Sequence, residues 1–108
     1  MVGQWQGVKA RKKYILLGMV RDKEIDTVLS LLPQNNYYLF TNAQIPRALP
    51  VNELIALSEK YHLQGHSFPT VTAAVEHALT VLNKQDALLI TGSFFIVGEA
   101  VEYFAGRA

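Results

Sequence analysis

The sequence of 108 residues contains no cysteine. This excludes disulfide bonds and thiolate metal sites, and it is compatible with a reducing cytoplasm. Charged residues make up only 18% of the chain, and they nearly cancel to a net charge of +1. The composition therefore offers no electrostatic case for nucleic-acid binding. No apolar run approaches the roughly 18 residues of a membrane span, so we expect a cytoplasmic protein without a membrane anchor.

Several catalytic signatures are also missing. The sequence has no GxxxxGK[ST] phosphate loop, no GxGxxG after an apolar run, and no GxSxG around Ser93. The three histidines, His62, His66 and His77, lack the spacing with carboxylates that metal ligands show, so we expect no metal site. We therefore expect no residue of this chain to carry covalent or acid–base catalysis by itself.

Half of the residues are hydrophobic, which predicts a folded protein, and the length predicts one domain spanning residues 1–108. Residues 1–13 are polar and contain glycine, with Trp5 as their one large apolar side chain. We interpret them as an irregular or partly helical entry segment. Its basic cluster (Lys9, Arg11, Lys12 and Lys13) is typical of a solvated surface.

Short apolar runs alternate with segments of helical periodicity along the rest of the chain. We interpret His66–Phe68 as a further short strand, and the apolar runs predict strands at Tyr14–Leu17, Tyr37–Phe40 and Ala87–Ile90. The last run has no polar alternation, which is typical of a strand covered on both faces. Apolar residues at helical spacing predict helices from Asp22 to Leu32, from Pro50 to Tyr61, from Pro69 or Thr70 to Leu82, and from Phe94 through Val97, Val101 and Phe104.

Four strands joined by helices predict a parallel sheet, because such crossovers connect parallel strands. We therefore expect an α/β fold with three layers and a Rossmann-like, mainly parallel sheet. Ligands of such sheets bind beyond the carboxyl ends of the strands. The loops expected there are Gly18–Lys23, Thr41–Arg47, Phe68–Thr70 and Thr91–Ser93.

The loop after the last strand is the strongest candidate site. Thr91, Gly92 and Ser93 turn the chain into a helix, whose first N–H groups favour a carboxylate or phosphate. Alternatively, Ser93 only caps its own helix. Arg47 lies between Pro46 and Pro50, which suits a preorganised contact with a phosphate or carboxylate. A structural role for Arg47, through hydrogen bonds of its loop, is an equal alternative.

Three segments together resemble the C-terminal domain of folylpolyglutamate synthetase/dihydrofolate synthetase, in the Mur ligase superfamily. They are YILLGMVRDKEIDTVLSLLP, YYLFTNAQIPRALPVNEL and LLITGSFFIVGEAVEYF, and they lie between Tyr14 and Tyr103. The features that carry the resemblance are a strand ending in GMxxDK, a loop with IPRALP, and a strand ending in TGS before a helix.

The resemblance implies an ATP-dependent ligase of folate biosynthesis and one-carbon metabolism. Such enzymes join L-glutamate to folate or dihydropteroate through an acyl phosphate. ATP and Mg²⁺ are bound mainly by a separate N-terminal domain, and the C-terminal domain closes over that site. The resemblance implies that Lys23 and Ser93 bind glutamate, whereas Arg47, Thr91 and Gly92 remain possible anion or phosphate contacts. Without the resemblance, Lys23 is equally well a solvated lysine at the start of a helix.

The sequence departs from the family at its beginning. An Asp-x-x-His-Asn motif is missing, although residues 2–5 resemble the family's residues just after that motif. We therefore expect a fragment that is inactive alone and that works with an N-terminal ATP-binding domain. The alternative is a non-catalytic, Rossmann-like binding or interaction module.

Overall fold

The computed structural model describes residues 12–21, 25–34, 36–83, 85–92 and 94–107, and the side chains of all of these except 94, 95 and 107. Strands and helices alternate along the chain, as predicted. They are β1 (Lys13–Leu17), α2 (Ile25–Leu31), β2 (Tyr37–Phe40), α3 (Val51–Glu59), β3 (Gly65–Ser67), α4 (Val71–Val81), β4 (Ala87–Thr91) and α5 (Phe94–Arg107). The predictions for Trp5, for most of the basic cluster and for the start of a helix at Asp22 fall outside the described residues. The entry segment stays a prediction, except that its last residue, Lys13, begins β1.

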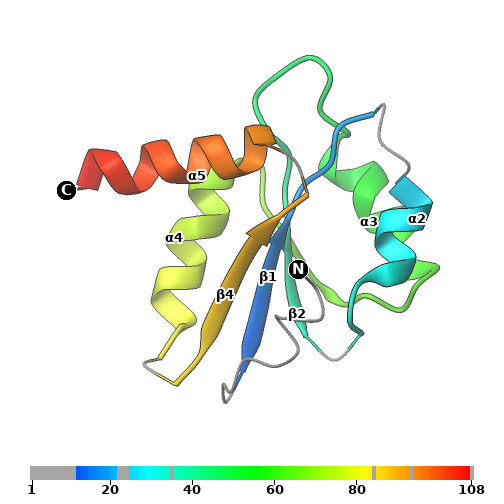
Figure 1. The fold of residues 1–108 in the computed structure, drawn as a ribbon, viewed down its shortest axis with the longest axis horizontal. Coiled ribbons are helices and arrows are strands. Elements are labelled where there is room, and N and C mark those ends of the chain that lie inside the picture. Colours follow the sequence, from blue (N-terminus) through cyan, green and yellow to red (C-terminus); the bar gives the residue numbers. More distant parts are fainter. Residues whose placement is uncertain (1–11, 22–24, 35, 84, 93, 108) are drawn as a thin grey trace.

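The four strands form one sheet in the order β3-β2-β1-β4. Every pair is parallel, with Tyr14 opposite both Tyr37 and Leu88 and with Tyr38 opposite Gly65. Helices α2 and α3 lie against one face of the sheet, and α4 and α5 lie against the other (Figure 1). The predicted three-layer, Rossmann-like fold is confirmed.

Strand β1 separates two hydrophobic cores. Ile15 and Leu17 belong to the core beneath α2 and α3, whereas Leu16 belongs to the core beneath α4 and α5. All three side chains are fully buried. Successive side chains of a strand point to opposite faces, so a strand in the middle of a three-layer domain needs apolar residues at every position.

Strand β4 differs from the prediction that both its faces are covered. All five of its side chains are only half-buried. The reason is its place at the edge of the sheet, where β1 flanks it on one side and no other described strand lies on the other. The apolar run predicted the strand correctly, but it carries no information about strand order.

Helix α5 is confirmed as a helix, but the predicted apolar stripe is not the one that packs on the sheet. Ile96 and Ala100 are buried in the core beneath α4 and α5. Val97, Val101 and Phe104 are exposed. Apolar residues occur around most of this helix, so periodicity alone did not identify the buried side.

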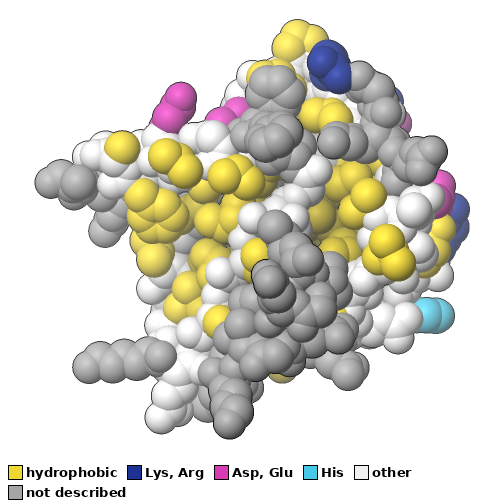
Figure 2. All heavy atoms as spheres, viewed as in Figure 1, with side chains coloured by type: hydrophobic (Ala, Val, Ile, Leu, Met, Phe, Trp, Pro, Cys, Tyr) yellow, Lys and Arg dark blue, Asp and Glu magenta, His cyan; other side chains and the backbone are white. Residues whose placement is uncertain are grey.

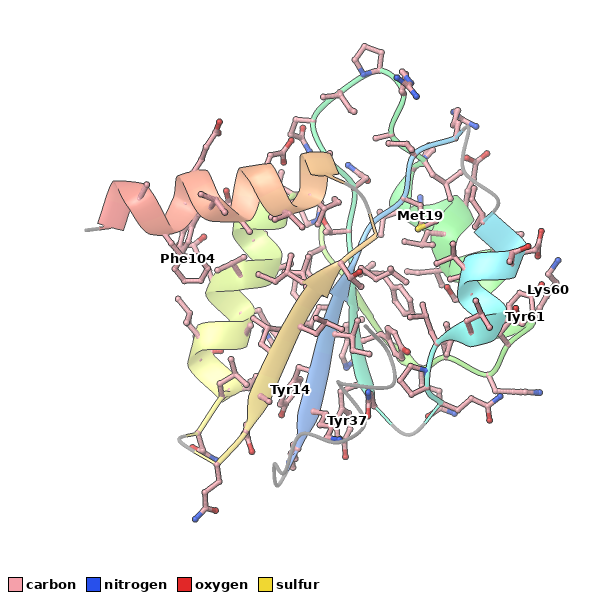
Figure 3. The ribbon with its side chains drawn as sticks, in the orientation of Figure 1. Tyr14, Met19, Tyr37, Lys60, Tyr61 and Phe104 are labelled. Carbon is pink, nitrogen blue, oxygen red and sulfur yellow. The ribbon has the colours of Figure 1, made fainter. Side chains whose placement is uncertain are left out.

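A small polar network ties α2 to the turn after α3. The Tyr61 hydroxyl donates to Asp26 Oδ1 at 2.7 Å, and Lys60 Nζ lies 3.0 Å from the same oxygen. Figure 3 shows Lys60 and Tyr61 beside α2. The hydrogen bond from Tyr61, followed by that from Lys60, lowers the pKa of Asp26. The same contact raises the pKa of Lys60 and of Tyr61.

Within the described part of the chain, no helix has the length and apolar character needed to cross a membrane.

Candidate functional site

The tips of β1 and β4 touch each other through their backbones at the carboxyl end of the sheet. The Gly18 N–H donates to the Thr91 carbonyl oxygen at 3.4 Å. Gly92 has φ +117°, and a Cβ there would collide with the Gly18 carbonyl oxygen. Gly18 is confined less strictly, because the two nearest atoms that a Cβ on it would meet belong to the side chain of Ile96 and not to backbone. The two glycines therefore bring the loops after these neighbouring strands into direct contact.

Backbone hydrogen bonds join the loop after β2 to the loop after β1. Leu49 N–H donates to Met19 O at 2.9 Å, and Arg21 N–H donates to Arg47 O at 2.9 Å. Val20 and Ala48 form an isolated antiparallel bridge between them. Figure 3 shows Met19 between the sheet and α3, where its side chain is buried. These two loops therefore form one continuous rim.

Hydrogen bonds also join the loop after β2 to the loop after β3. The Thr41 hydroxyl donates to Phe68 O at 3.0 Å, and Gln44 Nε2 donates to Pro69 O at 3.3 Å. The Asn42 side-chain oxygen accepts from Val51 N–H at 3.0 Å, which joins the loop to the start of α3. Hydrogen bonds therefore join the loops after β1, β2 and β3 directly, and the Gly18 contact extends the rim to β4.

Glu99 is a residue whose role the sequence did not reveal. Its Oε2 accepts from Gln44 N–H at 2.8 Å, so α5 holds the middle of the loop after β2. By itself, the i, i+3 spacing of Glu99 and Glu102 in the sequence indicates only a solvated helix face. Glu102 is exposed, as suggested. The contact of Glu99 joins residues 55 positions apart, and no local signal indicates such a pairing.

The predicted site residues fall into two groups. Thr91 ends β4 and is half-buried, Gly92 follows it, and Arg47 is exposed on the loop after β2. These three lie at the carboxyl end of the sheet, as predicted. Lys23 and Ser93 lie outside the described residues, so their assignment stays a prediction.

The described rim can offer charge and hydrogen bonds to a ligand. Arg47 and Arg21 are both exposed there, and Arg21 Nη2 lies 3.3 Å from Glu53 Oε2. An open pocket of about 420 Å³ is formed by the loop after β2, between Asn42 and Pro50. Its lining is mostly apolar residues and side-chain amides, and it contains no ionisable group. This chemistry suits binding and orientation of a ligand, not covalent catalysis.

No group of three or more His, Asp or Glu side chains suited to a metal ion occurs among the described residues.

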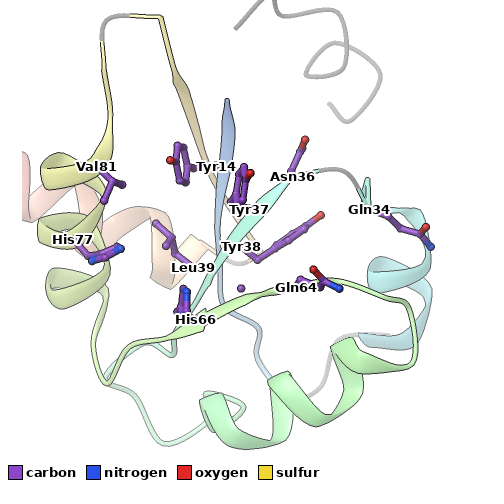
Figure 4. Close-up of a pocket in the computed structure, with 11 residues that line it drawn as sticks. Tyr14, Gln34, Asn36, Tyr37, Tyr38, Leu39, Gln64, His66, His77 and Val81 are labelled. Atoms are coloured by element: carbon purple, nitrogen blue, oxygen red, sulfur yellow. The ribbon is translucent and has the colours of Figure 1, made fainter. Parts of the chain in front are cut away.

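A larger pocket of about 640 Å³ lies at the opposite end of the sheet (Figure 4). It is lined by residues at the start of the strands, including Tyr14 and Tyr37, and by His77 of α4. The rings of Tyr14 and Tyr37 lie 5.5 Å apart, and the His77 ring packs 4.9 Å from Phe68. This pocket is distinct from the one formed by the loop after β2, although His77 also contacts Phe68 of the loop after β3.

The fold occurs in known ligase structures. E. coli FolC in complex with DHPP and ADP superposes with a TM-score of 0.82 at 22% identity, over 98% of this chain and 25% of that chain. A bifunctional folylpolyglutamate synthase/dihydrofolate synthase with Mn, AMPPNP and L-glutamate bound gives 0.77 at 20% identity, over 95% and 24%. Mycobacterium tuberculosis folylpolyglutamate synthase complexed with ADP gives 0.75 at 21%, over 93% and 25%. The chain thus spans about a quarter of the length of these structures.

No curated protein sequence matches the chain. Residues 2–94, however, match the family described as Mur ligase, glutamate ligase domain. The match covers most of the chain and includes all four strands and three of the four described helices. The chain therefore belongs to the Mur ligase family, as a glutamate ligase domain.

Proposed function

We propose that this chain is the domain of an ATP-dependent folylpolyglutamate or dihydrofolate synthetase that helps to bind L-glutamate and to close the active site. The single observation that carries the proposal is the Gly18–Gly92 backbone contact, which joins the tips of β1 and β4. Lys23 follows the first of these loops in sequence, and Ser93 follows Gly92 directly. An ammonium and a serine hydroxyl, from sequence positions that follow two neighbouring strands, suit the carboxylates of an amino-acid substrate.

In the complete enzyme, the folate or dihydropteroate carboxylate is activated as an acyl phosphate at the expense of ATP. The glutamate amine then attacks the acyl carbon, a C–N bond forms, the bond to phosphate breaks, and the amine loses a proton. The contribution of this domain is to hold glutamate with its amine toward that carbon. It is a contribution of proximity and orientation, which needs neither a nucleophile nor a general base from this chain.

ATP and Mg²⁺ bind mainly to the N-terminal domain in this proposal. Arg47 and the Thr91–Gly92 turn are the groups of this chain that would contact phosphate or another anion. Arg47 supports the proposal because it is exposed while its carbonyl oxygen is fixed by Arg21 N–H. Its loop is therefore held in place, and Arg47 is exposed at the rim.

The test is steady-state kinetics of the complete enzyme carrying Lys23→Ala or Ser93→Ala. A hydrogen bond to a charged group contributes about 1.5–3 kcal/mol, so we expect the KM for glutamate to rise about 10-fold or more. The KM for ATP should change less than about 2-fold, since both groups act on glutamate. Lys60→Ala is the control, because Lys60 follows α3 at the far end of the sheet. Equal effects on glutamate and ATP would contradict the assignment.

A further inference from the structure

The larger pocket is bounded by residues of β1, β2 and β3 and by one side of α4 (Figure 4). Tyr14 lies opposite Tyr37, and Leu39 lies opposite His66, so these four side chains share the sheet face that α4 covers. His77 of α4 lines the same space. Strands β1 and β2 each have a hydrogen-bonded strand on both sides. The floor of the pocket therefore does not depend on an open edge of the sheet.

The described residues that line the pocket carry no carboxylate, ammonium or guanidinium group. Their polar groups are three side-chain amides, three phenols and two imidazoles. Such groups donate and accept hydrogen bonds without offering a fixed charge. A charged ligand would lose hydration in this pocket without gaining an ion pair from its walls, so the lining favours an uncharged ligand.

Three of these polar side chains are not used by the fold. Tyr14 is only 8% exposed, yet its hydroxyl makes no hydrogen bond to another described residue. The ring nitrogens of His66 and His77 likewise make none, and Figure 4 shows the two rings projecting into the pocket from β3 and α4. By contrast, the Tyr38 hydroxyl donates to Pro33 O at 2.6 Å. The polar atoms of the first three side chains are therefore left for a ligand or for water.

Tyr37 adds a flat aromatic surface to the lining. It is 53% exposed, and the Tyr14 ring packs against it with 5.5 Å between the ring centroids. Lys12 Nζ lies 5.7 Å from the centroid of the Tyr37 ring. An exposed cation–π contact is weaker than the stacking of a heterocycle on an aromatic ring, so a ligand can displace this long side chain. The exposed ring therefore favours a planar ligand.

We propose that this pocket binds an uncharged, planar heterocycle of the size of a purine nucleoside. The volume of about 640 Å³ lies within the range of small-molecule sites. In this complex the heterocycle stacks on Tyr37, and its hydrogen-bonding edge faces His66, His77 and the amide of Gln64. Imidazole and amide groups each offer a donor and an acceptor, which is what the N6–H₂ and N7 edge of adenine requires. Adenosine is therefore the probe that fits this lining.

NMR titration of the 108-residue chain with adenosine tests the proposal. We expect saturable shifts of the amides of Leu39, Gly65, His66 and His77, with a dissociation constant of about 0.1–1 mM. The amide of Gly92, at the other end of the sheet, should not shift. L-glutamate and ribose should cause no shifts at the pocket, because glutamate is charged and ribose has no planar ring.

A second ligand, N6,N6-dimethyladenosine, tests the hydrogen-bonding edge separately from stacking. It keeps the planar ring but has no N6–H donor. We therefore expect it to bind at least about 5-fold more weakly than adenosine. Equal affinities of the two nucleosides would mean that the imidazoles and the amide do not contact this edge, and would overturn the proposed recognition.

Two substitutions test the contribution of the protein. Tyr37→Leu keeps an apolar side chain on β2 but removes the aromatic ring, so adenosine should bind at least about 5-fold more weakly. His66→Ala removes a hydrogen-bonding group of the pocket, so it should weaken binding by about 3- to 10-fold. His66 is exposed on β3, and we therefore expect this variant to fold.

Phe104→Leu is the matched control, because a planar ligand can also adsorb to apolar side chains elsewhere on the surface. Figure 2 shows hydrophobic side chains gathered over α5, and Phe104 of this helix is 42% exposed. The substitution removes an exposed aromatic ring outside the pocket. The affinity for adenosine should therefore stay within about 2-fold of that of the natural chain.

The proposal is overturned if the pocket amides show no saturable shifts up to about 5 mM adenosine. Equal weakening by Tyr37→Leu and Phe104→Leu would also overturn it, because it would indicate adsorption to any exposed ring. Circular dichroism checks the folding of each variant, and His66→Ala decides the case if Tyr37→Leu does not fold. The proposal does not rest on the ligase function, and a negative result would leave that function untouched.

Discussion

Gly92 shows most clearly how one residue shapes the candidate site. Its φ of +117° is poorly accessible to residues with a Cβ, and the Gly18 carbonyl oxygen occupies the space that a Cβ needs. We expect Gly92→Ala to lower the free energy of unfolding by about 2–3 kcal/mol, measured by urea denaturation.

Gly98→Ala is the matched control for Gly92→Ala. Gly98 lies within α5, and a Cβ there would meet nothing within 4 Å. Alanine is the better helix former, so this change should raise the free energy of unfolding by about 0.5–1 kcal/mol. Similar losses in both variants would show that the Gly18–Gly92 contact does not constrain the turn.

Burial of the Tyr38 hydroxyl makes the free energy of unfolding fall at high pH. Its side chain is fully buried, its hydroxyl donates to Pro33 O at 2.6 Å, and burial raises its pKa well above the ordinary value. Above about pH 10 the unfolded chain loses the Tyr38 proton while the folded chain keeps it, so folding stability falls as pH rises.

Tyr38→Phe should therefore reduce the decline of stability between about pH 9.5 and 11. At pH 7 the same variant should lose about 1 kcal/mol, because the hydrogen bond to Pro33 is removed. Urea denaturation of both proteins across this pH range provides the measurement. Parallel pH profiles for the two proteins would refute the role of Tyr38.

At the scale of elements, α5 controls the loop after β2 through Glu99. The carboxylate accepts from Gln44 N–H at 2.8 Å, and the Gln44 side chain continues the tether to Pro69 O. Glu99→Gln removes the charge from this hydrogen bond, so the Gln44 amide should exchange with solvent about 5- to 10-fold faster. Hydrogen exchange followed by NMR measures that rate.

Glu102→Gln is the control for this prediction, because Glu102 is exposed one turn further along α5. It removes the same charge from the same helix without touching the loop. Equal acceleration of Gln44 exchange in both variants would mean that net charge, and not the tether, governs the loop.

At the scale of the whole molecule, the loops at the carboxyl end of the parallel sheet form one candidate binding rim. We expect the isolated chain to bind L-glutamate weakly, with a dissociation constant of about 1 mM or higher, and to show no ligase turnover. NMR titration should shift the amides of Gly18, Gly92 and Arg47, which lie at the rim. His66 should not shift, since it lies in the larger pocket.

Sustained ADP production by the chain alone, dependent on folate and glutamate, would contradict the proposed dependence on a separate ATP-binding domain. Shifts centred on His66 would instead relocate binding to the larger pocket, at the start of the strands.

Much of the architecture could be predicted from the sequence. Short apolar runs and helical spacing predicted β1, β2, β4 and the four helices of the described residues, because burial imposes these periods locally. The short strand predicted at His66–Phe68 occurs one residue earlier, as β3 at Gly65–Ser67, where all three residues are exposed. The alternating order then required parallel strands. The position of Arg47, Thr91 and Gly92 at the carboxyl end followed from that topology. The roles of Lys23 and Ser93 rest on family resemblance and remain predictions.

Only the tertiary structure decided which strand lies at the edge, which side of α5 is buried, and which backbone N–H donates to the carboxylate of Glu99. Ala87–Ile90 has the apolar run of a covered strand, yet β4 is half-buried because nothing local encodes the order β3-β2-β1-β4. Val97 and Ile96 are both apolar, and the docking angle of α5 buries only the latter. Such features depend on contacts between residues distant in sequence, so periodicity and residue type cannot reveal them.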